Sequence, residues 1–336
     1  MPALSTGGEI VREYLSNEEY AKLPRLTLAK LIYSKNKEVY NTVESVRTFI
    51  RQNTGQAGSA RREKYALFKD EPRTQSYAND YKAMMPQSYA EDWTQFKIQK
   101  ASRKILILSD LHVPYHSIEA IILAIDYGLA RGADAVLLNG DTMDFHQISR
   151  FIKDPRARSL SDELQGGRDM LAMLRAAFPG IPIYYKEGNH DERLQHYLSL
   201  KAPELLGVME YTLGDLLKFG DNRIEHIGDK RIVMVGKLPV IHGHEVFGGA
   251  SVNPARTLYL RAKSSGLQGH NHRTSEHTEK DIHGEISTTW STGCLCELNP
   301  RYMPINNHNH GFAFVELDED GNYEVHNKRI YNGKIL

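Results

Sequence analysis

The sequence predicts an α/β protein in which two packed sheets carry helices on their outer faces. Residues 104–110 and 134–141 are continuous apolar runs that end in polar residues, which is typical of buried strands. Residues 117–132 between them have helical spacing, and strands that alternate with helices indicate βαβ units. After residue 222 shorter apolar runs dominate, and we expect these to form the second sheet.

The alternation continues along the chain. Residues 159–180 predict a long helix that Pro179 and Gly180 stop, and residues 181–191 predict a third buried strand. Ser117 is placed to cap the first helix. We assign residues 103–336 to this main domain and residues 76–102 to a connecting segment.

Residues 1–75 predict a small helical unit. Ser16 with Glu19, and Asn41 with Glu44, have the spacing of capping boxes that open short helices. Three short helices followed by the basic stretch "TGQAGSARREK" suggest a helix-turn-helix-like module that contacts nucleic acid. A helical cap or an oligomerisation appendage is the alternative.

Bulk composition favours no particular partner. The 336 residues carry 42 Lys and Arg against 42 Asp and Glu, so any attraction to a polyanion must be local. No apolar run approaches the roughly 18 residues of a membrane span, and the N-terminus lacks the hydrophobic region of a signal peptide. Cys294 and Cys296 are too close in sequence for good disulfide geometry, so we expect reduced thiols and a cytosolic location.

Each predicted strand end carries side chains that bind divalent metals, at the sheet edge where ligands of open α/β sheets lie. The candidates are Asp110, His112, Asp141, Asn189, His190, His242, His244, His270 and His272. Carboxylate, imidazole and amide oxygen together suit Mn²⁺, Fe²⁺ or Zn²⁺. Even seven of these nine side chains exceed the needs of one open site, but seven ligands fit two ions that share a carboxylate and clamp a phosphoryl group.

The pieces "DLH", "GD", "GNHDE", "HGH" and "GHNH", in this order between residues 103 and 275, resemble the signature of the calcineurin-like metallophosphoesterase superfamily. The residues around these motifs resemble those of family members found in phages and prophages. The resemblance implies a four-layer αββα sandwich with a dinuclear metal centre. We favour Mn²⁺, with Fe²⁺, Zn²⁺, Ni²⁺ or Mg²⁺ as alternatives.

The resemblance also implies a role for each residue of the motifs. Asp110, His112 and His272 would hold the first metal, Asn189, His242 and His270 the second, and Asp141 would bridge the two. His190 would act as general acid, a task that suits an imidazole near neutral pH.

Several neighbours of the motifs are candidates for support or for substrate contact. We expect Asp144 and His146 to brace the site and His244 to orient His242 or Asp141. Arg193 and Arg273, like Arg150 and Lys153, are candidates to pair with substrate phosphate, with ordinary surface charge as the alternative.

Residues 288–312 fall mostly outside the shared signature and are rich in aromatic, Asn and His residues. They are expected to shape the substrate pocket, with Trp290, Tyr302 and His308 or His310 at its mouth. Burial of a sheet edge and a homo-oligomer contact are equally open alternatives.

Together these features predict a phosphoester hydrolase that uses two metals to activate water. The helical unit, the basic stretch and the phage-like motifs favour a phosphodiesterase or nuclease acting on DNA, RNA or nucleotides, in the cytosol of a bacterium or phage-infected host. The alternative is a phosphomonoesterase acting on protein or a small molecule. A non-catalytic nucleic-acid-binding module is disfavoured because no expected ligand is missing.

Overall fold

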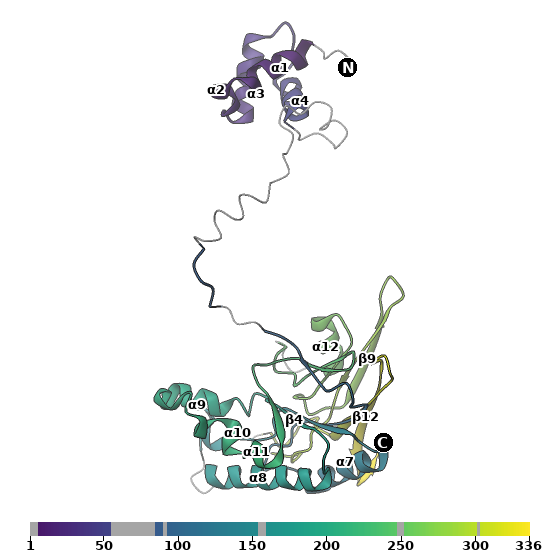
Figure 1. Cartoon of the computed structure of the whole chain (residues 1–336). Coiled ribbons are helices and arrows are strands. Elements are labelled where there is room, and N and C mark those ends of the chain that lie inside the picture. Colours follow the sequence, from purple (N-terminus) through teal and green to yellow (C-terminus); the bar gives the residue numbers. More distant parts are fainter. Residues whose placement is uncertain (1–5, 55–84, 90–92, 154–158, 247–251, 301–302) are drawn as a thin grey trace. The chain divides into compact units, whose positions relative to one another are not determined.

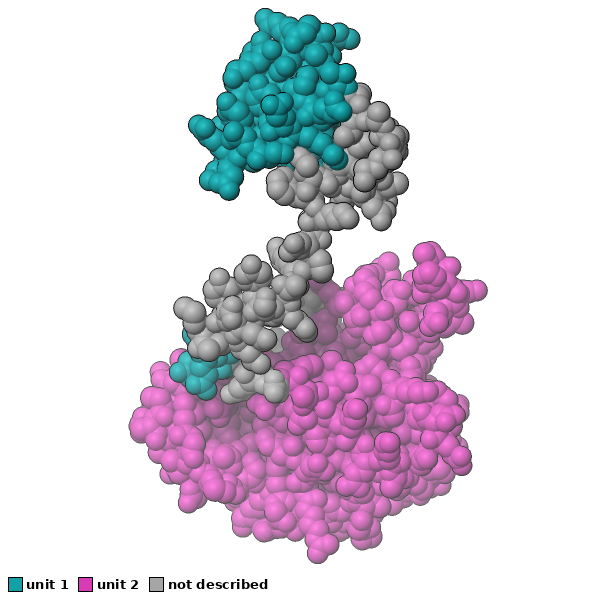
Figure 2. Space-filling view, turned by 45° about the horizontal axis from the view of Figure 1, so that its top comes forward, with its two compact units in different colours: residues 1–90 teal, residues 91–336 magenta. Residues whose placement is uncertain are grey.

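The computed structural model describes residues 6–54, 85–89, 93–153, 159–246, 252–300 and 303–336. Contacts divide the chain into two units, Met1–Ala90 and Glu91–Leu336, which Figure 2 colours separately. Residues 55–64 of the basic stretch, residues 76–84 of the connecting segment and Tyr302 lie outside the described residues.

The first unit contains a helical bundle. Its described helices are α1 (Thr6–Ser16), α2 (Glu18–Ala21), α3 (Arg25–Lys35) and α4 (Val43–Asn53). One face of the longer helices buries apolar side chains against the others, including Val11, Leu28, Ile32, Val46 and Ile50. The described part of the unit therefore has a core of its own.

The helix starts in this unit correct two sequence expectations. Asn17, and not Ser16, accepts the N-cap hydrogen bond of α2, because Ser16 is the last residue of α1 and its hydroxyl donates to a carbonyl within that helix. Thr42, and not Asn41, caps α4. The described residues of the unit form four helices, where three were expected.

The second unit contains a seven-stranded and a six-stranded sheet. The larger runs β13 (Lys334–Ile335), β12 (Tyr323–Tyr331), β11 (His310–Leu317), β2 (Lys104–Leu108), β3 (Ala135–Asn139), β4 (Ile183–Lys186), β5 (Ile224–Ile227). The smaller runs β1 (Phe96–Lys97), β6 (Val233–Val235), β7 (Leu238–Ile241), β8 (Gly266–Gln268), β10 (Ile286–Ser291), β9 (Ser275–Lys280). Strands β2 to β5 are parallel, and so are β7, β8 and β10.

Helices cover the outer faces of both sheets (Figure 1). The larger sheet carries α7 (Ile118–Arg131) and α8 (Leu160–Ala177), and α12 (Pro254–Ala262) packs on the smaller sheet. The remaining described helices are short: α9 (Arg193–Lys201), α10 (Leu213–Leu216), α11 (Phe219–Asn222), η1 (His146–Ile148), η2 (Pro203–Leu205) and η3 (Met209–Tyr211). The predicted caps of α7 and α8 are confirmed, with Ser117 and Ser159 as N-cap residues.

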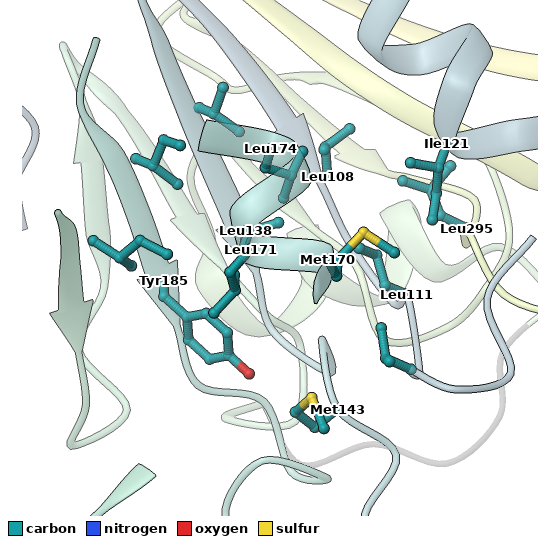
Figure 3. Close-up of a cluster of buried hydrophobic side chains, with 14 of the residues drawn as sticks. Leu108, Leu111, Ile121, Leu138, Met143, Met170, Leu171, Leu174, Tyr185 and Leu295 are labelled. Carbon is teal, nitrogen blue, oxygen red and sulfur yellow. The ribbon is translucent and has the colours of Figure 1, made fainter. Parts of the chain in front are cut away.

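Two-sided burial explains the continuous apolar runs. Leu108 and Leu138 lie against Leu171 and Leu174 of α8, as Figure 3 shows. Alternate residues of the same strands, such as Ile107, belong to a second core cluster together with side chains of the smaller sheet. Since each fully buried Leu or Ile contributes roughly 1.5–3 kcal/mol, both faces stabilise the sandwich, and the predicted αββα fold class is confirmed.

The expectation that Trp290 lies at the mouth of a pocket is wrong. Trp290 is on β10, is only 9% exposed, and belongs to the core between the sheets, where its ring lies 6.2 Å from that of Tyr323. The imidazole of His310 also contacts the protein backbone, since its Nε2 lies 2.9 Å from the carbonyl oxygen of Cys296. Among the described residues, no helix combines the length and the apolar character that a membrane span requires.

Candidate metal centre

The predicted ligands meet where parallel strands of both sheets end. Asp110 follows β2, Asp141 follows β3 and Asn189 follows β4 in the larger sheet, while His242 follows β7 and His270 follows β8 in the smaller one. Because parallel strands end at the same edge of a sheet, and the two sheets are packed face to face, loops far apart in sequence converge on one pocket.

The backbone at this pocket is strained. Asp110, His112, Asp141, His270 and His272 all have φ between 50° and 66°, in the left-handed region. Only a few per cent of non-glycine residues adopt such angles, and each costs on the order of 1–3 kcal/mol unless its surroundings impose it. Five of the seven predicted ligands therefore have an unfavourable backbone conformation, which the surrounding structure imposes and which directs their side chains into the pocket.

Two glycines of the motifs leave space for ligands. A Cβ atom at Gly188 would lie 2.2 Å from Asp141 Oδ1, and one at Gly140 would lie 2.4 Å from His242 Nδ1. Gly140 also has a φ of 85°, which favours glycine. The glycines of "GD" and "GNH" are thus explained by close approach to the neighbouring side chains.

A first group of ligand atoms surrounds Asp110. His272 Nε2 lies 3.3 Å from Asp110 Oδ1 and 3.2 Å from His112 Nε2. His112 Nε2 lies 3.7 Å from Asp141 Oδ2. Asp110, His112 and Asp141 together offer ligand atoms within 4.8 Å of one another.

A second group surrounds Asp141 from the other sheet. His242 Nε2 lies 3.3 Å from Asp141 Oδ2, and His270 completes a set whose ligand atoms lie within 4.8 Å of one another. Asp141 Oδ1 accepts a hydrogen bond from the backbone N–H of His190 at 2.8 Å, which leaves Oδ2 toward the imidazoles. Asp141 therefore belongs to both groups, as a bridging ligand must.

The donor set fits cations. Asp110 Oδ1, Asn189 Oδ1, His242 Nε2 and His270 Nδ1 are buried and make no hydrogen bond of good geometry with the described residues. Leaving such an atom unpaired costs about 1–3 kcal/mol. The opposite ring nitrogens of two ligands are occupied, with His242 Nδ1 2.8 Å from the Asn139 carbonyl and His112 Nδ1 3.1 Å from Asp144. This arrangement is typical of imidazoles whose other nitrogen binds a metal.

The electrostatics of the pocket also favour positive charge. Burial favours the neutral form of Asp141, but the nearby imidazoles of His242 and His190 outweigh it and hold the pKa of that carboxyl well below its usual range. Although burial opposes it, Asp141 raises the pKa of His242 to about 10. Burial and the charge of His242 lower the pKa of His270 to about 4. The buried carboxylates therefore stabilise positively charged groups in the pocket.

His190 stands at the rim of the cluster. Its Nδ1 lies 3.0 Å from Asp144 Oδ1, and its Nε2 lies 3.9 Å from Asp141 Oδ2. The same Asp144 oxygen contacts His112 Nδ1 at 3.1 Å. Burial opposes ionisation of Asp144, but its hydrogen bonds to His112 and His190 lower the pKa of this carboxyl below its usual range. One carboxylate therefore orients both imidazoles.

The other predicted supporting residues divide into two sets. Arg193 Nη1 donates to the Asp144 carbonyl at 2.6 Å, and His146 lines a cavity beside His190. His244 Nε2 contacts Glu192 Oε1 at 3.1 Å and its ring centre lies 5.3 Å from that of His242, so the expected role of His244 in orienting His242 or Asp141 stays a prediction. Arg273 is half-buried next to His272 and is not among the residues that line the cavity.

Sequence reasoning missed Asp191, which organises the loops of the site. This buried carboxylate accepts hydrogen bonds from the Tyr185 hydroxyl at 2.6 Å, from Gly188 N at 2.8 Å and from Met143 N at 3.1 Å. The signal was its position inside "GNHDE". Cys296 was also missed as a neighbour of the site, and its thiol lies 3.8 Å from His272 Nδ1.

Comparisons with known proteins identify the family of the chain. Residues 103–291 match the model of the family described as calcineurin-like phosphoesterase, which is more than half of the chain. The Gene 54 protein of Mycobacterium phage L5 is 31% identical over 234 residues, which cover 65% of this chain and 90% of that protein.

Two solved structures are similar in part. Vps29 from Entamoeba histolytica has a TM-score of 0.39 at 15% identity and covers 69% of this chain and 96% of its own. A dimetal phosphatase from Danio rerio has a TM-score of 0.36 at 14% identity and covers 68% of this chain and 96% of its own. With its motif residues gathered where strands of both sheets end and the family model matched across them, the chain belongs to the calcineurin-like phosphoesterase family.

Proposed function

We propose that this phosphoesterase is a phosphodiesterase or nuclease that acts on nucleic acid or nucleotides with two divalent metal ions, for which we favour Mn²⁺. The observation that carries the proposal is the pair of ligand groups that overlap at Asp141 and contain buried atoms without hydrogen bonds. Such a pair suits two ions that share a carboxylate.

The ligands divide by their contacts. We assign the first ion to Asp110, His112 and His272, the second to Asn189, His242 and His270, and the bridge to Asp141. When bound, two such ions would polarise the phosphoryl oxygens and make water a stronger nucleophile at neutral pH. The protein fixes these side chains in advance, through the strained backbone and the hydrogen bonds behind each imidazole.

We assign the role of general acid to His190. Asp144 accepts from Nδ1, so Nε2, which lies 3.9 Å from Asp141 Oδ2, is the nitrogen that would pass a proton to the leaving oxygen. Asp144 also fixes the orientation of the ring, which a positioned acid requires. In this structure Arg193 Nη2 donates to His190 Nε2 at 2.9 Å, so Arg193 must turn to the phosphate before Nε2 can carry the acid proton, and its charge then lies beside the developing anion.

A cavity of about 1160 Å³ beside His190 favours a diester over a monoester. A diester carries two organic groups on the phosphate, and a nucleic acid continues past the scissile phosphate in both directions, so it can extend into a cavity of this size. Phosphomonoesterase action remains the alternative function. The relative in a Mycobacterium phage supports our expectation that the chain works in the cytosol of a phage-infected bacterium.

The first experiment compares bis-p-nitrophenyl phosphate with p-nitrophenyl phosphate as substrates of the full chain, with and without added Mn²⁺. We expect faster turnover of the diester, with activity lost in a chelator and restored by the metal. Preference for the monoester would select the alternative function, and a metal-replete protein that turns over neither substrate would indicate the non-catalytic module.

Replacement of the bridge tests the metal assignment. Asp141→Asn is expected to lower the content of both ions together, because the bridge serves both and one negative charge is removed. Metal content after dialysis checks this, with the exposed Asp320→Asn variant as a matched control. Loss of a single ion would show that Asp141 does not bridge.

Replacement of the acid tests the role of His190. His190→Ala is expected to keep both metals but to lower kcat by roughly 10²–10⁴-fold for substrates with poor leaving groups, the usual contribution of a positioned acid. Substrates with good leaving groups should lose less. The exposed His283→Ala variant is the control, and an equal loss for both kinds of leaving group would remove His190 from proton transfer.

We further propose that residues 1–75 contact nucleic acid, on the basis of the short helices and the basic stretch of residues 54–64 in the sequence. A chain without residues 1–75 is then expected to lose part of its DNA retention, together with the steep salt dependence that phosphate contacts produce. Retention on DNA at two salt concentrations checks this. Equal salt dependence with and without these residues would assign the unit a different role.

A further inference from the structure

The cavity beside His190 is a groove between two elements of the main unit. One wall is the loop 144–153, which contains η1, and the other is the face of α9 that carries Arg193, His196, Tyr197, Leu200 and Lys201. These positions recur every three or four residues and so share one side of the helix. Asn189 and His190 form the inner end, where the groove meets the metal centre.

The described lining is strongly cationic for a chain without net charge. Arg150, Lys153, Arg193 and Lys201 lie along it, and Asp144 is the one carboxylate among the lining residues. That carboxylate is already engaged by His112 and His190. Within the described part of the chain, Arg150 and Lys201 form no ion pair. Arg193 Nη1 lies 4.0 Å from Asp144 Oδ1, so it is mainly Arg150 and Lys201 that offer positive charge to a ligand in the groove.

The groove also exposes aromatic and aliphatic side chains that a protein surface normally buries. Phe151 is 55% exposed and Tyr197 is 41% exposed, and Ile152 and Leu200 are more exposed still. The guanidinium carbons of Arg150 and Arg193 lie 5.7 Å and 5.9 Å from the centre of the Phe151 ring. Charge and ring faces thus alternate along one surface.

We propose that this groove binds single-stranded nucleic acid on the leaving-group side of the scissile phosphate, an inference that rests on the proposed phosphodiesterase function. Cationic side chains along a track with exposed aromatic rings are the combination that binds unpaired strands, through phosphate contacts and base stacking. In a duplex the base faces are covered, so Phe151 and Tyr197 select unpaired bases.

Position and size support the same occupant. The strand that leaves with the protonated oxygen must pass His190, and the groove begins at that residue. Its volume of about 1160 Å³ exceeds the roughly 300–1,000 Å³ of ordinary small-molecule pockets. A polymer therefore matches this space better than a single small phosphoester.

The test uses the full chain and the ratio of two kcat/KM values, for a single-stranded oligonucleotide of about twelve nucleotides and for bis-p-nitrophenyl phosphate. Tyr197→Ala is expected to lower this ratio roughly 5- to 100-fold, the usual effect of removing one stacked base contact. Tyr197→Phe keeps the ring and should keep the ratio. Tyr331→Ala, at an exposed tyrosine of β12, is the matched control.

A second readout does not require turnover. With metal removed by a chelator, an oligonucleotide that contains 5-iodouracil is expected to cross-link to Phe151 or Tyr197 on irradiation, as located by mass spectrometry. Cross-links confined to other residues would overturn the proposal, and so would an unchanged ratio in Tyr197→Ala or equal cleavage of the same sequence as a duplex. Absence of hydrolysis with cross-links at these rings would instead reject the proposed function and leave the groove assigned.

Discussion

The buried carboxylate of Asp141 is the constraint on which the site depends. It is almost fully removed from solvent, its backbone is in the left-handed region, and its neighbour across the loop must be a glycine. A buried charge of this kind is stable only among compensating partners. His242 from one sheet and the His190 backbone from the other supply them, so the site also joins the two halves of the sandwich.

The packing of the sheets makes that meeting possible. Each buried strand has apolar side chains on both faces, so its register is fixed by the helices on one side and by the second sheet on the other. A shift of one residue in the register of a strand would turn the side chains of each face to the opposite face of the sheet. The register of each strand is therefore fixed, and with it the position of the strand end. Side chains that must converge on one metal site need strand ends fixed in this way.

How much of this could be predicted from sequence follows from the same physics. Strands β2, β3 and β4 and helices α7 and α8 were predictable because two-sided burial and capping leave local signals. Strand β8 has three residues and β9 is largely exposed and polar, so neither has an apolar period to detect. Trp290 was misplaced because its sequence neighbours do not reveal which face of β10 is buried. The convergence of the predicted ligand residues could be expected, since their motifs follow strand ends. The motif "GNHDE" contains Asp191 but does not reveal its role, because that role consists of hydrogen bonds to Tyr185, Gly188 and Met143.

Asp144 links the metal centre to the groove. Its carboxylate holds His112 on the metal side and His190 on the groove side, while its backbone carbonyl holds Arg193, the first cation of the groove. The ligand cluster prescribes chemistry at phosphorus and is insensitive to what the phosphate is attached to. Selection of substrate must then come from the walls, and the loop 144–153 and α9 form those walls without contributing a metal ligand. The same framework can therefore keep its chemistry while the residues around Phe151 and Tyr197 change what it accepts.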